Sequence, residues 1–110
     1  MASSHLPNYL RAFRKRLGLS QDEVAFLLGV KTGAKVCRHE RFVREPSLEA
    51  ILGYEAIFQK SVRELFRGQF QQIQKGVVER AKVLCKRQSA NKGHALRTRR
   101  LQTLKEIVER

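Results

Sequence analysis

The stretch Ser20–Glu40, SQDEVAFLLGVKTGAKVCRHE, decides how the rest of the chain is interpreted. It holds two short amphipathic segments joined by a tight turn. Ser20 followed three residues later by Glu23 is a capping box, which predicts a helix beginning at Gln21. Gly29 ends that helix, because glycine takes a left-handed backbone conformation without a Cβ penalty. Two helices joined so closely are typical of a helix-turn-helix unit.

The second helix of this unit is expected over Thr32–Glu40, with Thr32 as its N-cap. Val36 and His39 are its inward positions, and it has fewer apolar residues than its neighbours. A helix of this kind often presents most of its surface to a partner. The inward face of the preceding helix is expected to consist of Val24, Ala25, Leu27 and Leu28.

Three further helices are expected around this unit. The first begins near Pro7 and ends at Gly18, with Leu10, Phe13 and Leu17 facing inward. A fourth is capped by Ser47 and bears the apolar residues Leu48, Ile51, Leu52, Ala56, Ile57 and Phe58. A second capping box starts a short fifth helix with Val62, Leu65 and Phe66, after which Gly68 closes the compact part.

The predicted fold class is therefore all-α, with a compact five-helix domain over residues 1–68 and a helical extension over residues 69–110. In the extension, apolar residues recur at intervals of three and four, as in a short coiled-coil seam. The seam predicts either a dimerisation surface or a strap on a larger monomeric core. "SANKGH" at 89–94 is interpreted as a linker before a final helix. The seam residues are Phe70, Ile73, Val77, Ala81 and Leu84.

Charge is the strongest compositional feature. The 110 residues contain 23 Lys and Arg against 10 Asp and Glu, for a net charge of +13. Residues 1–68 carry +5 and residues 69–110 carry +8. Such an excess destabilises the compact state by self-repulsion unless a polyanion neutralises it, and nucleic acid is the default candidate.

Other functional classes find little support in the sequence. Cys37 and Cys85 stand far apart without metal-ligand or disulfide spacing. The sequence also lacks paired carboxylates, nucleophile–base spacing and a phosphate-binding glycine loop, so no metal, no cofactor and no catalytic residue is expected. No apolar run is long enough to span a bilayer, and the N-terminus lacks a signal-type segment. The expected location is the cytoplasm, associated with a bacterial-type nucleoid.

The blocks "LRAFRKRLGLSQDEVAFLLGV", "KVCRHER" and "REPSLEAILGYEAIFQKSVRELF" together resemble the phage-repressor-like, or XRE, helix-turn-helix family. The resemblance runs from about Leu10 to Phe66. It implies a lambda-repressor-like five-helix domain whose third helix lies in the DNA major groove. It also implies a structural ion pair between Arg14 and Glu40, and a phosphate contact from Gln21. The alternative for Gln21 is an ordinary polar residue in the first helical turn.

The spacing departs from the family in one place. Val36 follows Gly29 by seven residues and Glu40 follows it by eleven, one more than is usual in the family. The extra residue is expected near "TGA", where it extends the turn and leaves the helix after it intact. Base-reading positions are therefore not transferable one by one, and the candidates are Lys31, Thr32, Gly33, Ala34, Lys35 and Arg38.

The chemistry of these side chains limits their roles. Lys35 and Arg38 can reach the O6 and N7 atoms of guanine, and Ala34 can touch a thymine methyl group. Arg41 and Arg44, just past the helix, are better placed for phosphates. For each of these cations the alternative is a solvated surface charge.

The function that these patterns favour is a sequence-specific DNA-binding regulator, a repressor or autoregulator. A homodimer on a palindromic operator is expected, because one recognition helix covers only a half-site. One alternative is a protein–protein module, such as an antitoxin, whose basic tail binds an acidic partner through the C-terminal helices. Another is a nonspecific nucleic-acid binder, against which the sequence offers no aromatic stacking platform. An enzyme is the least expected.

Overall fold

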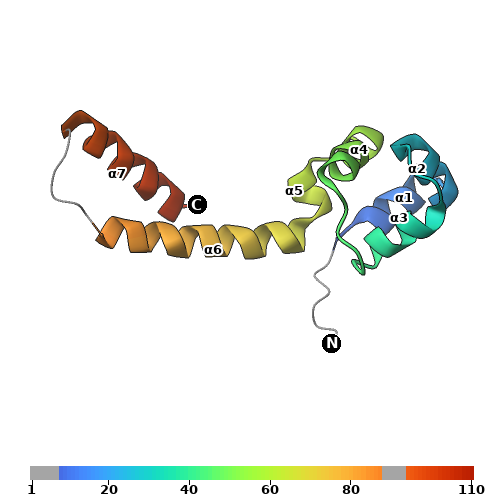
Figure 1. Cartoon of the computed structure of the whole chain (residues 1–110), viewed down its shortest axis with the longest axis horizontal. Coiled ribbons are helices and arrows are strands. Elements are labelled where there is room, and N and C mark those ends of the chain that lie inside the picture. The colour runs from blue at the N-terminus through green and yellow to red at the C-terminus, as the bar shows by residue number, and fades with distance from the viewer. Residues whose placement is uncertain (1–7, 88–93) are drawn as a thin grey trace. The chain divides into compact units, whose positions relative to one another are not determined.

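A computed structural model describes residues 8–87 and 94–110, the side chains of 94–97 excepted. Throughout these residues the chain is helical, with seven helices and no strand (Figure 1). The all-α prediction is confirmed for this part of the chain. None of the described helices combines the length and hydropathy needed to cross a membrane. Pro7 and residues 89–93 of the predicted linker lie outside the described residues.

The chain divides into two compact units, residues 1–70 and 71–110. The expected boundary at Gly68 falls two residues earlier. Gly68 does not end the compact part, because it lies in the first turn of helix α6 (Arg67–Lys86). A glycine in this position lowers helix propensity, but the helix continues without interruption on both sides of it.

The first unit is built from five short helices and the start of α6. Its core takes one fully buried side chain from each of the five: Leu10, Val24, Val36, Tyr54 and Leu65. No single helix could bury its apolar face alone, so these five positions hold the unit together. The helices are α1 (Leu10–Arg16), α2 (Gln21–Leu28), α3 (Gly33–Glu40), α4 (Leu48–Phe58) and α5 (Val62–Leu65).

The predicted start and end of α2 are confirmed. The Ser20 hydroxyl accepts the Glu23 amide at 3.0 Å, and the Glu23 carboxylate accepts the Ser20 amide at 2.8 Å. Gly29 follows the helix with φ of 80°, the left-handed conformation expected there. The turn then leads to Thr32, from which α3 runs without interruption to Glu40.

Gly33 marks the closest approach of α3 to α2. Its amide donates to the Asp22 carboxylate at 3.0 Å. A Cβ at Gly33 would lie 2.5 Å from that carboxylate oxygen and 2.9 Å from the Asp22 backbone nitrogen. Thr32 occupies the N-cap position, but its side chain makes no capping hydrogen bond. Asp22, one helix away, thus satisfies an amide at the start of α3.

Several apolar residues expected to face inward are exposed instead. They are Leu17 just after α1, Leu27 on α2, and Leu48, Leu52 and Ala56 on α4. On α4 the buried face belongs to Ala50, Tyr54 and Phe58. The apolar residues of α4 are spread over nearly all sides of the helix, so its sequence alone does not show which side is buried. Phe26 on α2 is 83% exposed, the most exposed of the large apolar side chains described.

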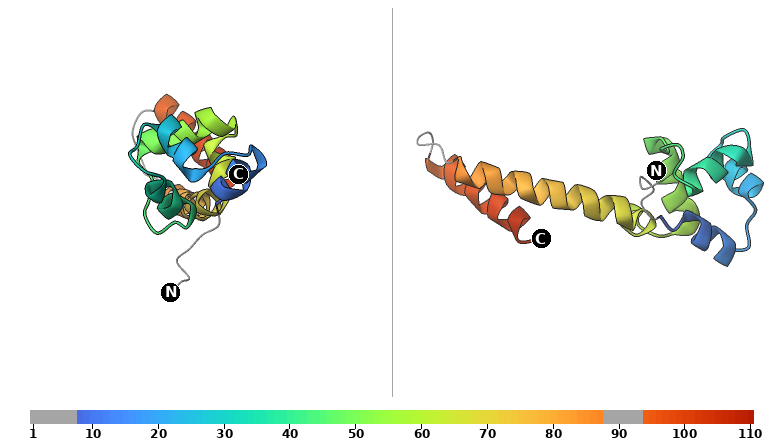
Figure 2. Two further views of the ribbon diagram at one scale, coloured as in Figure 1. Left: turned by 90° about the vertical axis from the view of Figure 1, so that its right-hand side faces the viewer. Right: turned by 90° about the horizontal axis from the view of Figure 1, so that it is seen from below.

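In the second unit, α7 (His94–Val108) lies beside α6, as Figure 1 and the right-hand view of Figure 2 show. Ala81 and Leu104 are the buried apolar residues among its described side chains. Ala81, expected in a dimer seam, is therefore covered by its own chain. Phe70 is half-buried, and the Arg63 guanidinium lies 4.4 Å from its ring centre. The remaining seam residues Ile73, Val77 and Leu84 are exposed.

We predict that Gly33→Ala destabilises the first unit by about 1–3 kcal/mol, because the new methyl group must push α3 away from α2. Urea unfolding followed by circular dichroism measures this. Gly76→Ala is the control, since its Cβ would meet only the flexible guanidinium end of Arg80, and alanine favours the helix. Equal stability of Gly33→Ala and the parent would contradict the close packing.

Candidate functional site

Helix α3 has two faces of opposite character. Gly33, Val36 and His39 are buried against the domain. Ala34, Lys35 and Arg38 are exposed and share the opposite face. The exposed residues Lys31 and Thr32 precede this face, and Arg41 and Arg44 follow it. The helix therefore presents a cationic surface that its own domain does not cover.

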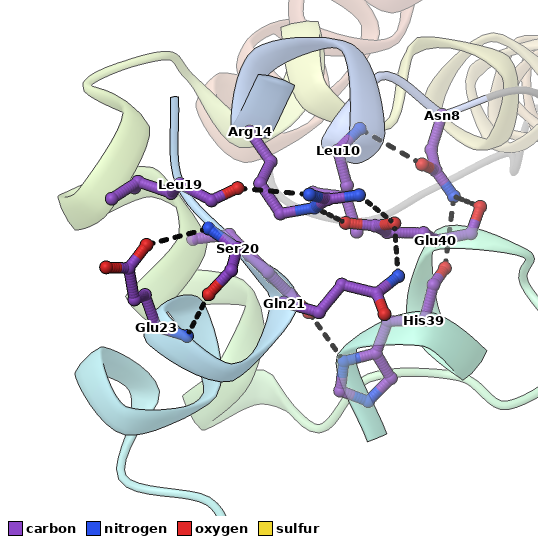
Figure 3. A network of polar contacts seen from close by, with 10 residues as sticks. Asn8, Leu10, Arg14, Leu19, Ser20, Gln21, Glu23, His39 and Glu40 are labelled. Carbon is purple, nitrogen blue, oxygen red and sulfur yellow. Dashed lines mark hydrogen bonds and ion pairs between the residues drawn. The ribbon is translucent and has the colours of Figure 1, made fainter. Parts of the chain in front are cut away.

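The predicted ion pair between Arg14 and Glu40 is confirmed and fixes the C-terminal end of α3 (Figure 3). The Arg14 Nε donates to Glu40 at 2.6 Å and Nη2 donates to the other carboxylate oxygen at 3.2 Å. Nη1 donates to the Leu19 carbonyl at 3.0 Å. The hydrogen bond to Glu40 raises the pKa of Arg14, although burial opposes this. The bidentate geometry restrains both side chains.

Gln21 belongs to the same network. Its amide nitrogen donates to the Glu40 carboxylate at 3.1 Å, and the residue is half-buried (Figure 3). The resemblance implied a phosphate contact for Gln21, with an ordinary polar residue as the alternative. In the structure its side chain ties the start of α2 to the end of α3.

Asn8 secures the end of α3 from the other side. Its amide nitrogen donates to the carbonyls of His39 at 3.3 Å and Glu40 at 3.5 Å, while its oxygen accepts the Leu10 amide at 3.1 Å (Figure 3). One side chain thereby contacts two carbonyls at the helix end, and the His39 carbonyl also accepts the Phe42 amide at 3.0 Å. After the helix, Phe42 takes a positive φ of 54°, a conformation that a helix C-terminus more often gives to glycine.

His39 and Tyr54 form a buried hydrogen bond that sequence reasoning missed. The His39 Nδ1 lies 2.8 Å from the Tyr54 hydroxyl, and the two rings meet edge to face. Burial lowers the pKa of His39, and the charges of Lys35, Arg38 and Arg44 lower it further. Burial also raises the pKa of Tyr54, as does the charge of Glu40. Both groups are therefore neutral near pH 7, and the bond links α3 to α4.

The structure corrects one of the predicted base-reading residues. Gly33 is buried against Asp22 and faces α2, so it is not part of the exposed surface. The contact with Asp22 supplies a steric reason for a glycine at this position, and only the three-dimensional arrangement of α2 and α3 could reveal it. Cys37 is half-buried on the flank of the helix.

A scan against protein-family models, a search of curated proteins and a search of solved structures each find no match to this chain. What the site can do is therefore argued from its geometry. Among the described residues no group of His, Cys, Asp or Glu side chains is arranged to hold a metal ion. The outward face offers ammonium and guanidinium donors around a small apolar residue. These groups suit an anionic partner that presents carbonyl or phosphate oxygens.

We predict that the free energy of unfolding decreases as the pH falls below 6.5, the ordinary pKa of histidine. Below that pH the unfolded chain binds a proton at His39 while the folded chain resists it, and the effect levels off below the lowered folded-state pKa. Urea unfolding between pH 7.5 and 5 measures this. His39→Gln should show a weaker dependence, and equal dependence in both proteins would contradict the assignment.

Proposed function

We propose that this chain is a sequence-specific DNA-binding transcriptional regulator that inserts α3 into the major groove. The observation that carries the proposal is the division of α3 into two faces. Val36 and His39 anchor one face, while Lys35 and Arg38 are exposed on the other. A helix held this way can enter a groove without losing its contacts to the domain.

The side chains of the exposed face suit base edges. Lysine and arginine donate to guanine O6 and N7, and the Ala34 methyl group can contact thymine. Lys31 at one end, and Arg41 and Arg44 at the other, extend the cationic surface beyond the helix. Cations in such flanking positions suit phosphates, which fix the register of a protein on the duplex.

Two further features support the proposal. The net charge of +13 calls for a polyanionic partner. The first unit also resembles the phage-repressor-like family in its capping box, its turn glycine and the Arg14–Glu40 ion pair.

A protein-binding role is the second candidate, and exposed residues of α2 favour it. Phe26, Leu27 and Leu19 line a groove of about 370 Å³ together with the acidic side chains of Asp22 and Glu23. An exposed phenylalanine beside carboxylates suits a basic, partly apolar protein segment.

Selection of preferred sites from a random duplex library tests the leading proposal. A sequence bound well above the random background supports a DNA-reading role. Equal binding to all sequences would contradict it, and binding to no duplex at all would favour the protein-binding role. The symmetry of a selected site also reports the oligomeric state on DNA.

We predict that Lys35→Ala and Arg38→Ala each weaken binding to the preferred site by about 1–3 kcal/mol and relax sequence choice. Arg44→Ala is the control for a phosphate contact. It should weaken binding to all sequences alike and reduce the slope of log K against log salt by about 0.9. Fluorescence anisotropy across a salt series measures both effects. Unchanged affinity in both α3 variants would contradict the proposed orientation of α3.

We further propose that the regulator acts as a homodimer through the second unit. Ile73, Val77 and Leu84 are exposed on α6, and a unit with two buried apolar residues among its described side chains gains little stability alone. Pairing two copies would cover these three side chains. It would also place two α3 helices on one operator.

Ile73→Glu is expected to weaken self-association at least tenfold, because the interface would have to bury a carboxylate. Sedimentation equilibrium measures this. Gln71→Glu adds the same charge on another face of α6 and should leave the association constant nearly unchanged. If the parent chain is monomeric at all accessible concentrations, the dimer proposal is wrong.

A further inference from the structure

The second unit carries a concentration of positive charge that the proposed role of α3 does not use. Residues 71–110 hold 11 Lys and Arg against 3 Glu. Among its described residues, the ion pair that forms joins Lys82 to Glu79 at 3.5 Å, and both side chains are largely exposed. Such an exposed pair contributes little. Most of the charge on the described side chains of this unit is therefore available to a partner.

Part of the charge converges on one groove between α6 and α7. The groove has a volume of about 320 Å³. Lys82, Lys86 and Lys105 line the groove together with Cys85 and Val108. Glu109 is the one acidic side chain of the lining, so cations prevail. Two helices that lie side by side thus bring three lysines together from distant parts of the sequence.

We propose that this lysine groove, defined by Lys82, Lys86 and Lys105, is a second, sequence-independent contact with the phosphate backbone of duplex DNA. The inference rests on the proposed function of the chain as a DNA-binding regulator. It assigns the two units different tasks: α3 reads bases, and the lysine groove adds affinity without adding specificity.

The chemistry of the groove favours phosphates over bases. Lysine is a compact point charge that attracts phosphate oxygens without the planar geometry used to recognise a base edge. Residues 71–110 contain no Phe, Tyr or Trp. Single-stranded nucleic acid is normally held by stacking on such rings, so the duplex backbone is the better partner.

The position of the groove on α6 is compatible with the proposed dimer. Relative to the buried Ala81, Lys82 and Lys86 lie on one flank of the helix. By the helical repeat, the exposed residues Ile73 and Leu84 lie on the other flank. A second copy that covers the apolar flank leaves the lysine groove open to DNA.

The test compares full-length variants with equal charge changes. In the groove variant, Lys82, Lys86 and Lys105 are replaced by Gln. In the control variant, Arg99, Arg100 and Arg110, which are exposed outside the groove, are replaced by Gln. In a third variant Arg replaces the three groove lysines and keeps the charge. Fluorescence anisotropy measures binding to a random 30-base-pair duplex and to the selected site across a salt series. Circular dichroism checks the helix content.

We expect the groove variant to reduce the slope of log K against log salt by about 0.9 for each lysine that neutralises a phosphate. Binding to random and selected duplexes should fall by the same factor, so that their ratio is unchanged. The control variant should change the slope less than half as much, and the arginine variant should bind as the parent does.

Three results would overturn the proposal. Equal slope changes in the groove and control variants would mean that the charge acts diffusely. A change in the ratio of selected to random binding would mean that the groove reads sequence. An unchanged slope combined with weaker self-association in sedimentation would make the groove a protein contact. Failure to select any preferred site would count against α3 as a reader, while the random duplex would still test the groove.

Discussion

The buried ion pair between Arg14 and Glu40 is the interaction on which the first unit depends. It joins α1 to the end of α3, and the Leu19 carbonyl and the Gln21 amide complete its hydrogen bonds. Removing two charges from water is costly, so such a pair is tolerated only when its donors and acceptors are satisfied. Loss of one partner would leave the other charge buried and unpaired, at a cost of about 3–5 kcal/mol. That is a large share of the stability of a small domain.

Other contacts also hold α3 in its position in the domain, at different points along the helix. Asp22 holds its first amide, Tyr54 meets His39 at 2.8 Å, and Asn8 binds its last carbonyls. These contacts engage the backbone or the inward side chains. The outward side chains Lys35 and Arg38 take part in none of them. The domain thus fixes the position of the helix and leaves its exposed chemistry unconstrained, as a surface that selects among partners requires.

Much of this arrangement could be predicted from the sequence, and the failures have physical causes. The start and end of α2 could be predicted from local sequence, because the Ser20–Glu23 capping box and Gly29 depend only on residues close to them in the chain. The pairing of Arg14 with Glu40 followed from the resemblance of longer blocks. Tyr54 was missed because α4 is apolar on most sides, and only its neighbours decide which side is buried. The contact of Gly33 with Asp22 was missed because it depends on how closely two helices approach. Ala81 was assigned to a seam because periodicity does not show which partner covers a face.

The close contact at Gly33 has a consequence for how this chain could diversify. The residues at positions 33, 36, 39 and 40 make contacts within the domain, so a substitution there would destabilise the fold before it changed which partner the exposed face binds. Positions 34, 35 and 38 are exposed, and substitutions there leave the supporting contacts in place. A combinatorial library confined to those three codons would therefore explore new partner choices on an unchanged framework. Natural substitutions that the fold tolerates would be concentrated at the same three positions.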